Sequence, residues 1–85
     1  MVKLEEISIP NCRECIHFKK IWGEIKNDFP YVEFREYDGL SPEGQELIQK
    51  YGILAAPGII INEELFSTGA VNKEKLIEKL KSLRQ

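Results

Sequence analysis

The two cysteines of this 85-residue chain are the side chains best suited to covalent chemistry. Cys12 and Cys15 are separated by two residues, so their sulfur atoms can meet within one helical turn. A thiolate can attack a disulfide and form a mixed disulfide, which a second thiol then resolves. Paired thiolates also bind soft metal ions such as Cu(I), and they can contribute to a shared zinc site. The spacing therefore indicates thiol–disulfide exchange or metal carriage.

The number of cysteines excludes two other classes of protein. A disulfide-stapled scaffold depends on several bridges, and this chain has only two cysteines. A four-thiolate zinc site within one chain is excluded because the ligands are too few. We expect no resident metal ion and no cofactor.

Composition and charge indicate a small globular protein. Hydrophobic residues make up 42% of the chain and charged residues 31%, and twelve Lys and Arg against fourteen Asp and Glu give a formal charge of -2. This balance offers no basic surface for nucleic acid. No apolar run approaches the roughly 20 residues that span a bilayer, and residues 1–6 lack the apolar segment of a signal peptide. We therefore expect one domain over residues 1–85, a monomer in the cytoplasm, bound neither to nucleic acid nor to a membrane.

The hydrophobic pattern alternates between strand and helix along the chain. The first two strands are joined through a helix, which predicts a parallel pair, and the last two are joined by a tight turn, which predicts an antiparallel pair. The sequence thus predicts an α/β fold with a four-stranded mixed sheet and three helices, in the order β-α-β-α-β-β-α. The expected strands cover residues 2–9, 32–37, 59–61 and 65–68, and the expected helices cover residues 12–29, the segment between Ser41 and Gly52, and the segment after Asn72.

The cysteine pair falls where the first strand meets the first helix. Backbone N–H groups and the positive end of the helix dipole favour a thiolate at such a position. Cys15 shares its helical stripe with Phe18 and Trp22, so it should point inward, whereas Cys12 should be exposed. We therefore assign Cys12 as the nucleophile, Cys15 as the resolving thiol and Trp22 to the core.

The neighbours of the pair are candidate modulators of its reactivity. The positive charge of Arg13 favours a thiolate at Cys12, and the negative charge of Glu14 opposes it. Asn11 with Glu14 could cap the helix, or Cys12 could occupy the capping position itself. The second arrangement is favoured because Pro10 rigidifies the approach to the turn.

Together with this element order, several segments resemble the thioredoxin/glutaredoxin fold. The resemblance is closest to small archaeal and bacterial thioredoxin-like proteins known as small redox-active disulfide proteins, and it covers nearly the whole chain. It implies a thiol–disulfide oxidoreductase that reduces protein disulfides or relays electrons, with a thioredoxin-reductase-like electron donor. The segments that carry it are residues 9–15, 51–53, 55–57, 60–62 and 68–71.

The resemblance also assigns roles to residues outside the cysteine loop. It implies that Pro57 is cis and faces the cysteines, while the backbone of Ala56 pairs with a partner segment. From the residues alone, a trans proline at the start of a strand is the favoured interpretation of Pro57. Gly69 ends the last strand, and we expect the loops around Pro57 and Gly69 to contribute to substrate binding. Glu63 stands in the hairpin where the family usually has glycine, which costs stability if φ is positive.

Glu6, on the first strand, has two interpretations. It can be a partly buried carboxylate beneath Cys15 that relays its proton, as the buried acid of thioredoxins does. Alternatively, Glu5 and Glu6 mark a sheet edge or a strand end in water. Lys19, on the first helix, is assigned to the solvated helix face.

Two further functions compete with disulfide exchange. The runner-up is a Cu(I) or zinc carrier that uses the same cysteines. Small copper chaperones usually carry a nearby Met, whereas Met1 is the only Met here and lies far from the loop in sequence. Their element order also ends on a strand, and this chain ends in a helix. The third possibility is a binding module without redox turnover, against which the presence of both cysteines argues.

Overall fold

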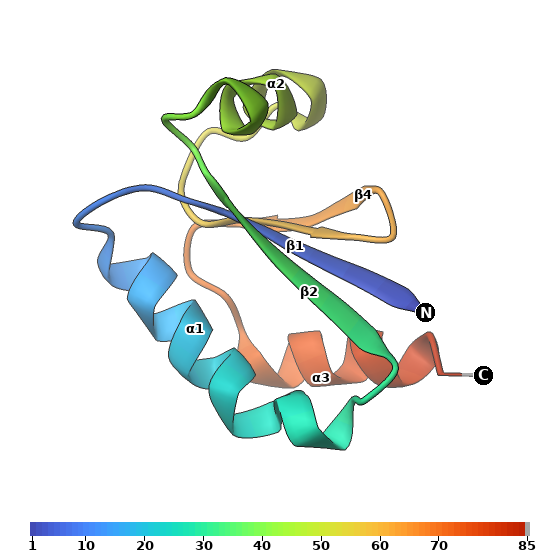
Figure 1. The fold of residues 1–85 in the computed structure, drawn as a ribbon. Helices are drawn as coiled ribbons and strands as arrows, with labels where there is room; N and C mark the ends of the chain where they lie inside the picture. The colour runs from blue at the N-terminus through green and yellow to red at the C-terminus, as the bar shows by residue number, and fades with distance from the viewer. Residues whose placement is uncertain (85) are drawn as a thin grey trace.

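The predicted alternation of strands and helices is confirmed in the computed structural model, which describes residues 1–84. The long first helix is shorter than predicted, because it ends at Ile25 and continues as one 3-10 turn. The elements, drawn in Figure 1, are β1 (Val2–Ser8), α1 (Arg13–Ile25), the 3-10 helix η1 (Lys26–Asp28), β2 (Val32–Asp38), α2 (Pro42–Tyr51), β3 (Gly58–Ile61), β4 (Glu64–Thr68) and α3 (Lys73–Ser82).

The four strands form one mixed sheet in the order β2-β1-β3-β4. β1 pairs with β2 in parallel and with β3 antiparallel, and β3 pairs with β4 antiparallel, as the connections predicted. Helices α1 and α3 lie on one side of the sheet and α2 on the other (Figure 1). Because β1 is a central strand covered on both faces, the alternative that placed Glu5 and Glu6 in water is wrong. Both residues are buried.

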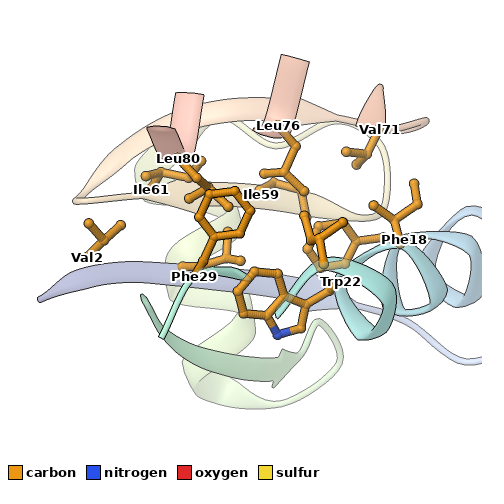
Figure 2. Close-up of a cluster of buried hydrophobic side chains, with 12 residues drawn as sticks. Val2, Phe18, Trp22, Phe29, Ile59, Ile61, Val71, Leu76 and Leu80 are labelled. Atoms are coloured by element: carbon orange, nitrogen blue, oxygen red, sulfur yellow. The ribbon is translucent and has the colours of Figure 1, made fainter. Parts of the chain in front are cut away.

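The main core fills the space between the sheet and the helices α1 and α3 (Figure 2). Trp22 lies in this core, as predicted, and its ring centroid is 5.9 Å from that of Phe34 on β2. Burial of this many large apolar side chains is the main source of stability in a chain of this length. The buried members are Val2, Leu4, Phe18, Ile21, Trp22, Ile25, Phe29, Ile59, Ile61, Val71, Leu76 and Leu80.

A smaller cluster joins the opposite face of the sheet to α2. Its buried members are Ile7, Ile53 and Ile60. Helix α2 has the predicted limits: the Ser41 side chain accepts a hydrogen bond from the Gly44 N–H, and Gly52 ends the helix with φ +64°. The site described below lies at the end of β1 that leads into α1.

The hairpin between β3 and β4 turns through two residues with positive φ. Asn62 has φ +49° and Glu63 has φ +65°. This is the left-handed region in which glycine is favoured, so Glu63 occupies the kind of position for which a cost was expected. The Asn62 side chain accepts a hydrogen bond of 2.9 Å from the Lys3 N–H and so ties the turn to the first residues of β1.

Candidate redox site

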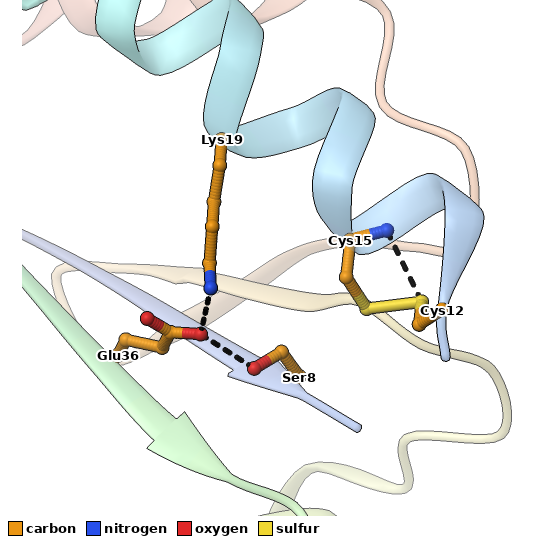
Figure 3. A network of polar contacts seen from close by, with 5 residues as sticks. All are labelled: Ser8, Cys12, Cys15, Lys19 and Glu36. Carbon is orange, nitrogen blue, oxygen red and sulfur yellow. Dashed lines mark hydrogen bonds and ion pairs between the residues drawn. A yellow bond between two sulfur atoms is a disulfide. The ribbon is translucent and has the colours of Figure 1, made fainter. Parts of the chain in front are cut away.

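Cys12 and Cys15 form a disulfide at the N-terminus of α1, with their Cα atoms 5.2 Å apart. Cys12 is the N-cap of the helix, and its Sγ accepts a hydrogen bond of 3.1 Å from the Cys15 N–H (Figure 3). Of the two capping arrangements left open by the sequence, the structure therefore has Cys12 and not Asn11 at the cap. A thiolate at this position would receive the same N–H and the positive end of the helix dipole.

The two sulfurs differ in exposure. Cys12 is half-buried, whereas the Cys15 residue is only 3% exposed and lies on the helix face that packs on the sheet. An incoming disulfide can therefore reach Cys12 far more readily than Cys15. This asymmetry is the one that exchange through a mixed disulfide needs.

The loop before β3 brings Pro57 and Gly69 together. The Ala56–Pro57 peptide bond is cis, the geometry that the resemblance implied. The Gly69 N–H donates a hydrogen bond of 3.1 Å to the Pro57 carbonyl, and Gly69 has φ +75°. Because Gly58 pairs with Ile7, Pro57 lies at the end of the sheet from which β1 leads to the cysteines.

An apolar cavity of about 140 Å³ opens beside this loop. It brings together Ile9 from the cysteine loop and Leu54 from the segment before Pro57. The Leu54 residue is 95% exposed. Neither residue was predicted to belong to the site, although an apolar residue in a loop next to a proline was a usable signal. The lining consists of Ile7, Ile9, Ile48, Ile53, Leu54, Ala55 and Ala56.

Glu6 lies on the face of β1 that is turned to α1, and it is completely buried. Neither of its carboxyl oxygens has a hydrogen-bond partner among residues 1–84. The pKa of Glu6 is raised to about 7, chiefly by burial and further by the nearby charge of Glu36, while the charge of Lys19 partly offsets the rise. The carboxyl group can therefore hold or release a proton near neutral pH.

A second polar group adjoins Glu6. The Lys19 ammonium forms an ion pair with the Glu36 carboxylate, and the Ser8 hydroxyl donates a hydrogen bond of 2.7 Å to Glu36 Oε2 (Figure 3). Partial burial pushes the pKa of Glu36 upward, but the hydrogen bonds from Lys19 and Ser8 outweigh it, so the pKa is lowered. From the sequence, Lys19 was assigned only to the solvated helix face, and this group was not predicted. The position of Lys19, one helical turn after Cys15, places it near the site but does not identify Glu36 as its partner.

The remaining predicted residues lie apart from this group. Arg13 is exposed. Glu14 Oε1 lies 3.7 Å from His17 Nδ1, one turn along the solvent side of α1. Within the described part of the chain, no cluster of three or more His, Cys, Asp or Glu is arranged to hold a metal ion. A metal carrier would have to rely on Cys12 and Cys15 alone. None of the helices formed by residues 1–84 combines the length and apolar character needed to cross a bilayer.

Comparison with known proteins relates this arrangement to one family. Residues 6–82 match the family model described as "Thioredoxin domain". A thioredoxin of Methanocaldococcus jannaschii is 35% identical over 80 residues, which cover 94% of this chain and 93% of that protein. Oxidised thioredoxin O2 from Arabidopsis thaliana has the same fold, with a TM-score of 0.78 and 16% identity over 100% of this chain and 76% of that one. Thioredoxin f2, in its complex with ferredoxin:thioredoxin reductase, gives a TM-score of 0.75 and 17% identity over 99% of this chain and 78% of the other.

Proposed function

Since this chain belongs to the thioredoxin domain family and is a thiol–disulfide oxidoreductase, we propose that it reduces disulfides of protein substrates and is itself recharged by a separate reductase. The observation that carries the proposal is the Cys12–Cys15 disulfide at the N-cap of α1, with one sulfur accessible and one shielded. We place this activity in the cytoplasm and assign it to the monomer.

The first step is attack by the Cys12 thiolate on a substrate disulfide. The bond from Cys12 to one substrate sulfur forms as the substrate S–S bond breaks, and the second substrate sulfur leaves as a thiolate that takes a proton from solvent. The Cys15 N–H, which donates to Cys12 Sγ, supports the negative charge on Cys12 before attack. The product is a mixed disulfide between Cys12 and the substrate.

The second step is attack by Cys15 on the Cys12 sulfur. Cys15 must first lose its proton, and we assign the Glu6 carboxylate as the acceptor, because it is buried on the sheet face that α1 covers and its pKa lies near neutrality. The Cys12–Cys15 bond forms as the mixed disulfide breaks and the substrate leaves as a thiolate. Two electrons have then passed to the substrate, and Glu6 returns its proton to solvent or to the departing thiolate.

The loops at this end of the sheet are suited to hold an extended substrate segment. Proline has no N–H, so Pro57 interrupts strand pairing and leaves the backbone of Ala56 as a local edge. The apolar cavity lined by Ile9, Leu54 and Ala56 continues this edge. We therefore propose that residues flanking the substrate cysteine pack against this surface, with Gly69 supporting the Pro57 loop.

An external reductase fits the same geometry. The disulfide in this structure must be reduced before another turnover, and two cysteines alone provide no source of electrons. The similar thioredoxin f2 is found in a complex with a ferredoxin:thioredoxin reductase, which supports a protein donor for this chain. The donor would reach Cys12, because Cys15 is shielded.

The test compares the two single cysteine variants in two assays: turnover of a protein disulfide with dithiothreitol as the reductant, and reaction of the reduced variant with the same protein disulfide after dithiothreitol has been removed. Cys15→Ser should accumulate a mixed disulfide on Cys12, visible by mass spectrometry as an adduct that excess dithiothreitol releases. Cys12→Ser, the matched control, should form no adduct and lose turnover. If the wild-type protein exchanges with no disulfide at neutral pH but retains Cu(I) against a competing chelator, metal carriage is the better account.

A further inference from the structure

We propose that the Lys19–Glu36 ion pair sets the protonation state of Glu6 and so positions the proton that Cys15 must lose, an inference that rests on the proposed role of Glu6. Lys19 and Glu36 are then positioning residues, because they act on the reaction through Glu6. Neither was assigned a part in the chemistry by its position in the sequence.

The backbone register places the two carboxylates side by side. Glu6 pairs with Glu36 across the parallel strands β1 and β2. On the other side of β1, Glu6 pairs with Ile59, a completely buried apolar residue of β3. The like charge that acts on Glu6 from the sheet therefore comes from one residue, Glu36.

Helix α1 contributes the opposite charge. Lys19 follows Cys15 by one turn, and its ammonium crosses from the helix to the Glu36 carboxylate on β2 (Figure 3). The same ammonium acts on Glu6 through space and favours its ionised form. Three charged side chains from β1, β2 and α1 thus converge on the polar end of the interface between the helix and the sheet. The residue before α3 and the buried residues of α3 contribute only apolar side chains to this core: Val71, Leu76 and Leu80.

The ion pair, unlike Glu6, borders an open cavity. An open cavity of about 440 Å³ reaches Lys19 and Glu36, and Glu6 is not among the residues that line it. Ser8, another lining residue, holds Glu36 by its hydroxyl hydrogen bond. The charges of the ion pair are therefore within reach of solvent in the cavity, whereas the Glu6 carboxyl group is completely buried. The cavity is lined by Ser8, Ile9, Pro10, Lys19, Glu36 and Asp38.

The two members of the pair act on Glu6 with opposite sign. Glu36→Gln removes the repelling charge and releases Lys19 to act on Glu6 alone, so the pKa of Glu6 should fall. Lys19→Met removes the attracting charge, so the pKa of Glu6 should rise. Each change should be about one pKa unit, the lower end of what a nearby charge produces. A merely structural ion pair gives no such opposition, because breaking it from either side has the same effect on packing.

The experiment follows the Glu6 carboxyl carbon by NMR as a function of pH in the oxidised protein, with its signal assigned by loss in Glu6→Gln. The variants are Lys19→Met and Glu36→Gln, with Lys20→Met and Glu33→Gln as controls that change net charge equally at exposed positions. We expect the midpoint for Glu6 to rise in Lys19→Met and fall in Glu36→Gln. The controls should leave it near the wild-type value.

The same variants are then compared in the pH profile of disulfide exchange. If the NMR midpoints for Glu6 in Lys19→Met and Glu36→Gln shift in the same direction, or shift no further than in the controls, the proposed control of Glu6 is overturned. Midpoints that move apart in the NMR titration, with an exchange profile that follows them, support the control and its part in the reaction. If the titration separates the variants and the exchange profile does not, the control of Glu6 stands. Glu6 is then rejected as the acceptor of the Cys15 proton.

Discussion

Leu4 and Glu6 stand two residues apart on the same face of β1, and both are completely buried. Leu4 pairs with Phe34 and Ile61 on the neighbouring strands and belongs to the main core. Glu6 lies where the same interface meets the cysteine helix, and within residues 1–84 nothing hydrogen-bonds to its carboxyl oxygens. One strand thus carries an apolar half that stabilises the fold and a polar half that costs stability.

The difference shows how so short a chain combines a stable core with reactive chemistry. Burial of a carboxyl group without partners disfavours its charged form, which makes proton transfer near neutral pH available. The cost is offset by the dense apolar contacts at the other end of the same helix–sheet interface, where the rings of Phe18 and Trp22 pack near Phe34. If this division is correct, substitutions in the two halves should differ in size, in sign and in pH dependence.

The largest effect is expected from Leu4→Ala. Removal of a completely buried leucine side chain should lower the free energy of unfolding by about 3–5 kcal/mol, from lost burial and the cavity that remains. Because no titratable group is removed, the loss should be equal at pH 5 and pH 8. Urea unfolding of the oxidised protein at the two pH values measures it. If the alanine variant does not fold, Leu4→Val provides the same comparison with a smaller loss.

The Glu6→Gln substitution should change the free energy of unfolding in the opposite direction, as a gain that grows with pH. The pKa of Glu6 is raised from 4.5 to about 7 in the folded protein. Between these values the unfolded chain releases the proton and the folded chain keeps it, so wild-type stability falls as pH rises, and the full cost is present above pH 7. The Gln variant has no carboxyl group at this position and therefore does not lose stability in this way. Its free energy of unfolding relative to wild type should therefore rise by about 3 kcal/mol between pH 4 and pH 8.

Urea unfolding of both proteins across this pH range gives the difference directly, since the other titratable groups are common to both. A difference that stays constant with pH would show that Glu6 ionises as readily in the folded protein as in the unfolded chain. The proposed function adds an opposite expectation for activity. At pH 8 the more stable Gln variant should exchange disulfides more slowly than wild type.

The sequence predicted the apolar half of β1 better than its polar half. A short segment of recurring apolar residues that ends at Pro10 located β1, and the helical stripe placed Cys15 and Trp22 inward. The same pattern did not predict that Glu6 is buried, since an acidic residue far more often lies in water at the end of a strand than in a core. Its burial is decided by the central position of β1, which depends on pairing between distant segments.

The ion pair between Lys19 and Glu36 was out of reach for a related reason. Helical spacing puts Lys19 at the edge of the buried stripe, a position that normally faces solvent. Its partner is fixed only when α1 crosses the sheet above β2 and the parallel register sets Glu36 beside Glu6. By contrast, the Cys12 cap depends on neighbouring residues and could be predicted locally.

The smallest effect is expected at the hairpin, which lies at the Leu4 end of β1 and apart from the cysteines. Glu63 has φ +65° and only a long ion pair of 3.9 Å with Lys3, in which both side chains are largely exposed. Glu63→Gly should therefore relieve strain and raise the free energy of unfolding by about 0.5–1 kcal/mol, because glycine tolerates this conformation and an exposed ion pair contributes little. The gain should be independent of pH and leave the rate of disulfide exchange unchanged, both of which urea unfolding and the exchange assay report. Here strain can be removed without loss of activity, whereas removal of the buried charge at Glu6 stabilises the protein at the expense of exchange. A Glu63→Gly protein that gained stability but exchanged more slowly would show that the two ends of β1 are coupled.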